Sequence, residues 1–208
     1  MTTPNAATTP AVTLEELAGA RRYAQYRQLV DQLLTEGKTT GPTQTEDLLA
    51  YARLNQQRMA RLEKTVRVQP DLQAAVQHLA QRYVWLVITE GWCGDAAQLV
   101  PVLDAVAQAS NGRIETRYLL RDEHLPLMDR YLTHGSRSIP KLIVLHADTL
   151  AEVATWGPRP ALAHELVLRL KAEGLSKTDA ATQLHTWYAQ DKTHTTQQEL
   201  LALVQRLD

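Results

Sequence analysis

The stretch YVWLVITEGWCGDA, residues 83–96, decides the fold, because an apolar run meets a Trp-Cys-Gly turn and then a helical pattern. Residues 83–88 are too short and too apolar for an amphipathic helix, so they predict a buried strand in a sheet that is covered on both faces. From Asp95 onward, apolar residues recur at helical spacing. Cys93 is therefore expected where a strand passes into the N-terminus of a helix. Free backbone N–H groups at such a place favour a thiolate over a thiol.

The composition excludes several classes of protein. The chain has 208 residues, and its 22 Lys+Arg against 23 Asp+Glu leave a formal net charge of -1. We expect no nucleic-acid partner and no membrane partner, because no global field attracts either. A single cysteine excludes an internal disulfide. Residues 1–10 lack the basic and apolar regions of a secretory signal, so a cytoplasmic location is predicted.

The N-terminal part of the chain predicts a tail and two helices. Residues 1–11, rich in Thr, Pro and Ala, are expected to be a flexible tail, and residues 12–66 a helical extension. Its first helix should begin at a capping box after Thr13 and run to Gly37. Its second helix should begin after Thr45. The arginines of the second helix are interpreted as a solvated face, because the aromatic residues that stack on bases are missing.

Residues 67–174 predict one domain in which helices and strands alternate. Pro70 opens a helix that leads into the strand at 83–88. A helix from Asp95, a strand over 114–120 and a helix over 122–133 are expected next. Strands over 142–145 and 151–155 should follow, and then a helix that ends at Gly174. The order strand, helix, strand implies a right-handed parallel crossover, and the last two strands are expected to be antiparallel.

Residues 175–208 predict a C-terminal extension of two further helices. Ser176 and Asp179 form a capping box for the first of them. Each extension carries apolar stripes that would be exposed if the helices stood alone. Both extensions are therefore expected to pack on the central domain.

The order of elements over residues 70–172 resembles the thioredoxin fold, an α/β fold with a central mixed four-stranded sheet flanked by helices. Trp92-Cys93-Gly94 looks like the start of that family's Trp-Cys-Gly-Pro-Cys active site. Pro101 falls where the family has the proline that kinks the active-site helix. Ile139-Pro140 is similar to its cis-proline loop, and Gly157 to the glycine before its final helix.

The chain departs from the family's pattern at three positions. Asp95 stands in place of the active-site proline, and Ala96 in place of the second cysteine, so a dithiol–disulfide cycle within the chain is impossible. Val87 stands where the family places a buried acid. The pattern is similar to a divergent bacterial group of thioredoxin-family proteins with a single cysteine and Trp-Cys-Gly-Asp at the active site.

The resemblance, together with the local chemistry, assigns the candidate site. Cys93 is the expected nucleophile. The negative charge of Asp95 should oppose a thiolate, so the pKa of the Cys93 thiol is lowered less than it would be beside an uncharged residue. Substrate-binding roles are expected for six residues: Trp92, Gly94, Ile139, Pro140, Arg137 and Lys141. The alternatives are an inert buried cysteine, a core tryptophan, a trans turn before Pro140, and solvated basic residues. No pair of histidines at metal-binding spacing accompanies Cys93, so no metal site is predicted.

The favoured hypothesis is single-cysteine thiol–disulfide exchange. Cys93 would attack a protein disulfide or a mixed disulfide with a small thiol, and a thiol such as glutathione would regenerate it without any other cofactor. A redox-inactive interaction module is the rival hypothesis, because Ala96, Val87 and Asp95 each remove part of the family's chemistry. A thiol redox sensor is the third. The oligomeric state is left open.

Overall fold

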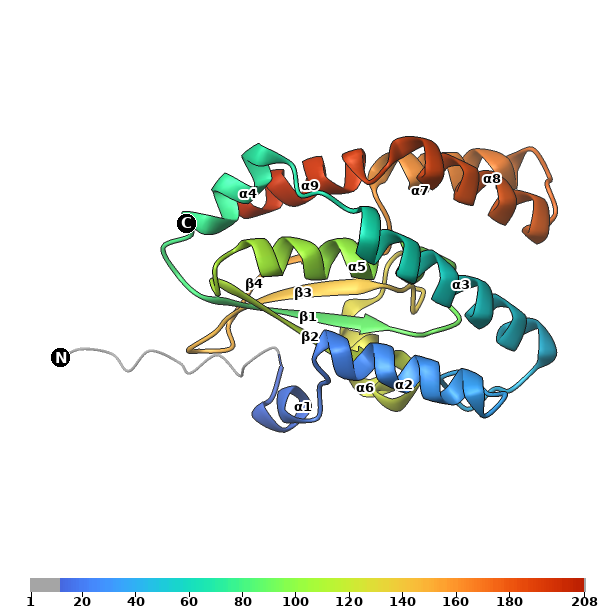
Figure 1. Cartoon of the computed structure of the whole chain (residues 1–208), viewed down its shortest axis with the longest axis horizontal. Coiled ribbons are helices and arrows are strands. Elements are labelled where there is room, and N and C mark those ends of the chain that lie inside the picture. The colour runs from blue at the N-terminus through green and yellow to red at the C-terminus, as the bar shows by residue number, and fades with distance from the viewer. Residues whose placement is uncertain (1–11, 208) are drawn as a thin grey trace.

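The computed structural model describes residues 12–207, so the predicted tail over residues 1–11 lies outside the described residues. Figure 1 shows a central sheet with helices on both sides. The N-terminal helices are α1 (Leu14–Ala18), α2 (Tyr23–Thr35), α3 (Glu46–Thr65) and α4 (Pro70–Gln77). The sheet consists of β1 (Tyr83–Thr89), β2 (Ile114–Leu120), β3 (Lys141–His146) and β4 (Glu152–Trp156). The remaining long helices are α5 (Gly94–Ala109), α7 (Ala161–Ala172), α8 (Lys177–Asp191) and α9 (His194–Val204).

The sheet has the strand order β2-β1-β3-β4. β1 pairs with β2 in parallel, and α5 connects them, as the strand-helix-strand pattern predicts. β3 is antiparallel to both β1 and β4. The mixed four-stranded sheet predicted from the sequence is therefore confirmed. Its topology brings the C-terminal end of β1 and the N-terminal end of β3 to the same edge, because Ile88 pairs with Lys141.

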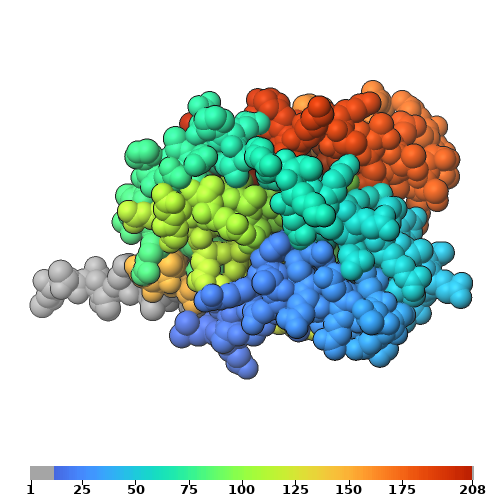
Figure 2. All heavy atoms as spheres, in the orientation of Figure 1, coloured from blue at the N-terminus to red at the C-terminus, as the bar shows by residue number. Residues whose placement is uncertain are grey.

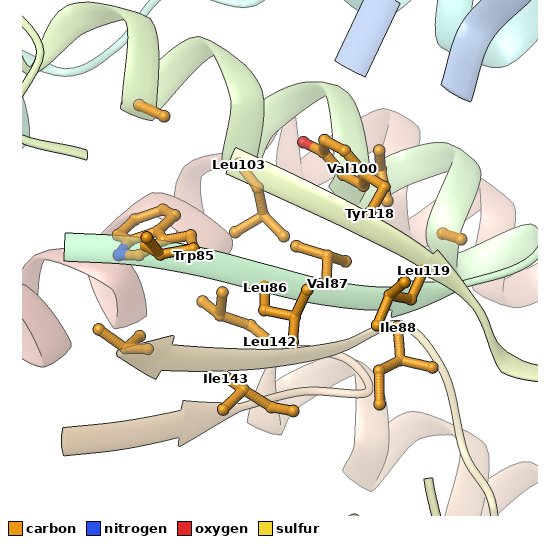
Figure 3. Close-up of a cluster of buried hydrophobic side chains, with 14 of the residues drawn as sticks. Trp85, Leu86, Val87, Ile88, Val100, Leu103, Tyr118, Leu119, Leu142 and Ile143 are labelled. Atoms are coloured by element: carbon orange, nitrogen blue, oxygen red, sulfur yellow. The ribbon is translucent and has the colours of Figure 1, made fainter. Parts of the chain in front are cut away.

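Apolar side chains of three strands and α5 form the core. Every residue of β1 is buried, as expected for a strand that is covered on both faces. Figure 3 shows Val87 on the side of β1 that faces Val100 and Leu103 of α5. Val87 is fully buried. The position that holds an acid in the resembled family is thus an ordinary part of the hydrophobic core here.

Both extensions pack on the central domain. Tyr26 and Val30 of α2 and Leu200 of α9 belong to the same hydrophobic cluster as β1. In the view of Figure 2, the N-terminal helices and the red and orange C-terminal helices cover much of the visible surface, with part of α5 between them. No helix in the described part of the chain is long and apolar enough to cross a membrane.

Two predicted helices are interrupted. The first predicted helix is divided into α1 and α2, because Arg21 leaves the helical path and exchanges two backbone hydrogen bonds with Tyr118 at the edge of β2. The predicted helix over 122–133 is wrong. A 3-10 turn (Arg121–Glu123), the short α6 (Leu125–Met128) and a second 3-10 turn (Asp129–Tyr131) replace it. Pro126 explains the break, because proline lacks the N–H that a continuous helix needs there.

Candidate functional site

Cys93 lies against the proline loop that precedes β3. It is the N-cap residue of α5, and 8% of its surface is exposed. Its Sγ–H donates a hydrogen bond to the carbonyl oxygen of Ile139 over 3.3 Å. The Ile139–Pro140 peptide bond is cis, as the sequence predicts. The two motifs, which are 46 residues apart in the chain, therefore meet at one point.

The electrostatic environment keeps the Cys93 thiol protonated. Burial raises the pKa of this thiol to about 12, and the neighbouring Asp95 carboxylate adds to the rise. The backbone N–H groups of Ala96 and Asp95 and the charge of Arg159 act in the opposite direction, but they are outweighed. The predicted lowering of the thiol pKa is therefore wrong for this structure. The helix N-terminus does favour the thiolate, yet removing that charge from water costs more.

Asp95 is held by residues from the C-terminal half of the chain. One of its carboxylate oxygens accepts hydrogen bonds from Arg159 at 2.5 and 3.2 Å, and the other accepts the Tyr188 hydroxyl at 2.7 Å. Asp95 itself is buried. The ion pair gives the guanidinium of Arg159 a carboxylate partner within the chain. The carboxylate is fixed by Arg159 and Tyr188, and it still disfavours a charge on Cys93.

Gly157 allows the loop between β4 and α7 to pass close to the proline loop. Its φ of 104° is in the region that favours glycine. A Cβ atom at this position would lie 2.5 Å from the carbonyl oxygen of Pro140. The glycine is thus required both by its conformation and by the lack of space, which gives a physical reason for the motif that the sequence analysis singled out.

Trp92 and Gly94 flank Cys93 on the outer side of the turn. The guanidinium of Arg121 lies 4.8 Å from the centre of the Trp92 ring, a cation–π arrangement. Gly94 lies under the ring of His185 from α8, because a Cβ atom on Gly94 would be 2.8 Å from Nε2 of that histidine. Burial lowers the pKa of His185 to about 4, with a contribution from Arg58. His185 is therefore neutral at physiological pH.

The two basic residues predicted to bind a small thiol differ in their surroundings. Arg137 is exposed and makes a two-pronged ion pair with Asp129, at 2.6 and 2.8 Å. Its guanidinium thus already has a carboxylate partner within the chain. Lys141 is buried, its amino group donates to the Thr133 hydroxyl at 3.3 Å, and burial lowers its pKa. The role of both residues toward a bound thiol stays a prediction.

Tyr26 and Glu90 lie near the site, although neither is predicted as a site residue from the sequence. Tyr26 of α2 is buried, and burial raises the pKa of its hydroxyl. A charge on Cys93 adds to this rise. Glu90 is fully buried directly after β1, where one of its carboxyl oxygens accepts a hydrogen bond from the N–H of Asp122. Burial raises the pKa of Glu90. A charged residue directly after a buried strand was the available signal.

A cleft of about 720 Å³ opens beside the segment from Trp92 to Asp95, on the side away from the proline loop. This segment, which joins the end of the β1–α5 loop to the first residues of α5, is called the Trp92–Asp95 turn. Its walls come from α3 and from the α7–α8 hairpin, and Trp92, Gly94 and His185 belong to its lining. The Cys93 thiol does not line it. Within residues 12–207, no group of three or more His, Cys, Asp or Glu side chains is placed to hold a metal ion. The cleft and the enclosed thiol are therefore two separate regions that share one turn.

Comparison with known proteins places this arrangement in a family. The family model described as thioredoxin matches residues 41–185. The chain belongs to the thioredoxin family. The match begins before the domain boundary that was predicted at residue 67, so it includes α3, and it extends into α8. The residues that line the cleft therefore lie within the matched region.

Solved structures show the same fold at low sequence identity. A crystal structure of a protein of unknown function from Pseudomonas aeruginosa is 16% identical, with a TM-score of 0.59 over 93% of this chain and 98% of that one. An HIV epitope scaffold is 17% identical, with a TM-score of 0.53 over 89% of this chain and 98% of that one. Both likenesses concern the fold alone. A comparison with the sequences of curated proteins gives no match.

Proposed function

We propose that this thioredoxin-family protein is a binding protein in which Cys93 is an unreactive, protonated thiol at rest. The observation that carries the proposal is the enclosure of Cys93, whose Sγ–H is bonded to the Ile139 carbonyl oxygen and is 8% exposed. Burial and the Asp95 charge raise the pKa of the Cys93 thiol, so the thiolate is a minor species at pH 7. The thiolate is the nucleophile in exchange. The ligand-binding surface is then the outer side of the Trp92–Asp95 turn.

Alkylation of Cys93 tests this proposal directly. The rate of reaction with iodoacetamide is measured from pH 6 to pH 9 on the native protein and on the same protein unfolded in urea. We expect the native thiol to react at least about a hundredfold more slowly, because both its exposure and its thiolate fraction are low. A native rate at pH 7 equal to that of the unfolded chain would overturn the proposal.

Thiol–disulfide exchange at Cys93 is the second candidate, and the position of the thiol beside the cis-proline loop favours it. An opened site would let the Cys93 thiolate attack a mixed disulfide of a protein with glutathione. The Cys93–glutathione disulfide would form, and the protein would leave as its thiolate. A second glutathione thiolate would then release Cys93 and produce glutathione disulfide. Turnover of such a mixed disulfide that is lost in Cys93→Ser would support this candidate over the binding protein.

A further inference from the structure

The cleft beside the Trp92–Asp95 turn has mainly apolar walls. Leu48 and Tyr51 of α3 line one side, and Val167, Leu175 and Leu184 line the side formed by the α7–α8 hairpin. The 43% exposed Tyr51 is among the larger apolar side chains left at the surface. Small-molecule sites typically measure about 300–1,000 Å³ and combine apolar walls with a few polar groups. The cleft, at about 720 Å³, is of this kind.

The charges that line the cleft are predominantly positive. Asp95 is the acid in the lining, and its carboxylate is already paired with Arg159. His185 is neutral, because its pKa is lowered to about 4. Lys171 and Lys177 are exposed, and neither forms an ion pair with any acid of residues 12–207. Two cations thus remain beside an apolar cleft without a partner.

Two exposed arginines in the segment between β2 and β3 show a different pattern. Arg137 pairs with Asp129, and Arg130 pairs with Glu16. Acids of the chain thus satisfy both of these cations, whereas Lys171 and Lys177 of the cleft form no ion pair with an acid of residues 12–207. A positive potential next to apolar walls attracts amphipathic anions and disfavours cations of the same shape.

We propose that the cleft binds a small organic anion with an apolar body and one terminal carboxylate. The body lies between α3 and the α7–α8 hairpin, and the carboxylate is held by Lys171 and Lys177. The inference rests on the proposed binding function and names the class of ligand for it. The volume of the cleft, about 720 Å³, fits a small molecule, and a peptide or protein partner becomes an outcome of the test.

Three probes with one common body test the charge preference. Phenylbutyrate, phenylbutanol and phenylbutylamine share the same aromatic body and carry a negative, a neutral and a positive end. Calorimetric titration of the full chain should show phenylbutyrate binding roughly five-fold more tightly than phenylbutanol, a modest factor because solvent screens the exposed lysines. Phenylbutylamine should bind most weakly. Equal binding of the three probes, or no binding of phenylbutyrate at 10 mM while a peptide or protein binds, would overturn the inference.

Matched variants locate the binding. Lys171→Gln with Lys177→Gln should reduce the preference for phenylbutyrate over phenylbutanol to less than about two-fold. The control, Lys64→Gln with Arg113→Gln, removes the same charge from exposed positions outside the cleft and should leave the preference unchanged. Ala181→Phe fills the cleft and should weaken both probes, whereas Ala189→Phe on the same helix but outside the cleft should not. Identical effects of test and control variants would contradict the site.

The outcome is separable from that of the proposed function. Slow alkylation of Cys93 without phenylbutyrate binding would remove the ligand class and leave the binding protein in place. Fast alkylation of Cys93 together with charge-selective binding would contradict the proposal that the thiol is unreactive, and it would support the cleft as a ligand site.

Discussion

The Trp92–Asp95 turn separates two regions that differ in almost every physical property. On the inner side, Cys93 is buried, protonated and hydrogen-bonded to the backbone of the proline loop. On the outer side, a cleft of about 720 Å³ has mainly apolar walls and two lysines that pair with no acid in the described part of the chain, residues 12–207. The inner region encloses a protonated thiol beside the cis-proline loop, whereas the outer region is an open concave surface with apolar walls.

The difference is explained by the helices added to the central domain. Tyr26 of α2 lies near the thiol, and Tyr188 of α8 donates to Asp95. The same α8 brings His185 over Gly94 and supplies one wall of the cleft. Helices that cover an active-site surface raise the cost of a thiolate and at the same time create a new concave surface. Closure of one region and opening of the other thus have one structural origin.

The largest expected effect comes from breaking the inner region at Gly157. Gly157→Ala places a Cβ atom 2.5 Å from the Pro140 carbonyl oxygen in a backbone conformation with φ 104°. We expect a loss of about 3 kcal/mol in the free energy of unfolding, from backbone strain and the clash together. Urea denaturation followed by tryptophan fluorescence measures it.

Gly174→Ala is the matched control for this substitution. Gly174 has a φ of 77°, but nothing lies within 4 Å of its would-be Cβ atom. It should therefore lose only about 1 kcal/mol, the conformational part of the effect. Equal losses at the two glycines would show that the close approach to Pro140 contributes nothing.

Asp95→Asn should affect both regions, because Asp95 lines the cleft and its charge also raises the pKa of the Cys93 thiol. The substitution leaves the Arg159 guanidinium, 19% exposed, without its carboxylate, and we expect a loss of roughly 2 kcal/mol in the free energy of unfolding, because solvent reduces the cost of the unpaired charge. The pKa of the Cys93 thiol should fall, because the Asp95 charge is one of the causes that raise it. Alkylation at a fixed pH should therefore become faster even though the protein is less stable.

A double-mutant cycle separates the pair from its surroundings. Asp95→Asn combined with Arg159→Gln should recover part of the lost stability, because no unpaired charge is left. Tyr188→Phe removes only one hydrogen bond to Asp95 and should cost about 1 kcal/mol. Strictly additive losses for Asp95 and Arg159 would mean that the ion pair makes no contribution of its own.

The pH dependence of stability tests the neutral state of His185 in the outer region. Its pKa is lowered to about 4 in the folded chain, against about 6.5 when unfolded. The unfolded state binds the extra proton first, so the contribution is present above pH 6.5 and is lost as the pH falls toward 4. Because the ring is partly solvated, we expect a loss of about 1–2 kcal/mol across this window. His185→Gln should reduce the slope there, and an unchanged slope would contradict the assignment.

Much of the inner region was predictable because its signals are local. The apolar run of β1, the helical spacing after Asp95 and the position of Pro140 before β3 are all read within short windows. The outer region depends on contacts between distant parts of the chain. Asp95 and Arg159 are 64 residues apart, and Asp95 and Tyr188 are 93 residues apart. No periodicity or motif reports such pairs, and the balance between burial and the helix N-terminus at Cys93 depends on them.

Arg137→Gln should have the smallest effect, and it tests whether a residue close to the proline loop in sequence also influences the Cys93 thiol. Arg137 lies two residues before Ile139, yet its guanidinium is exposed and paired with Asp129. Arg137→Gln should leave both the free energy of unfolding and the alkylation rate of Cys93 unchanged within error, because exposed ion pairs contribute little. Arg159→Gln is the matched comparison, since the charge of Arg159 favours the thiolate, and it should slow alkylation at the same pH. If Arg137→Gln also slowed alkylation, its side chain would have to reach the thiol in solution, and the proline loop would then be open enough to admit a charged substrate beside Cys93.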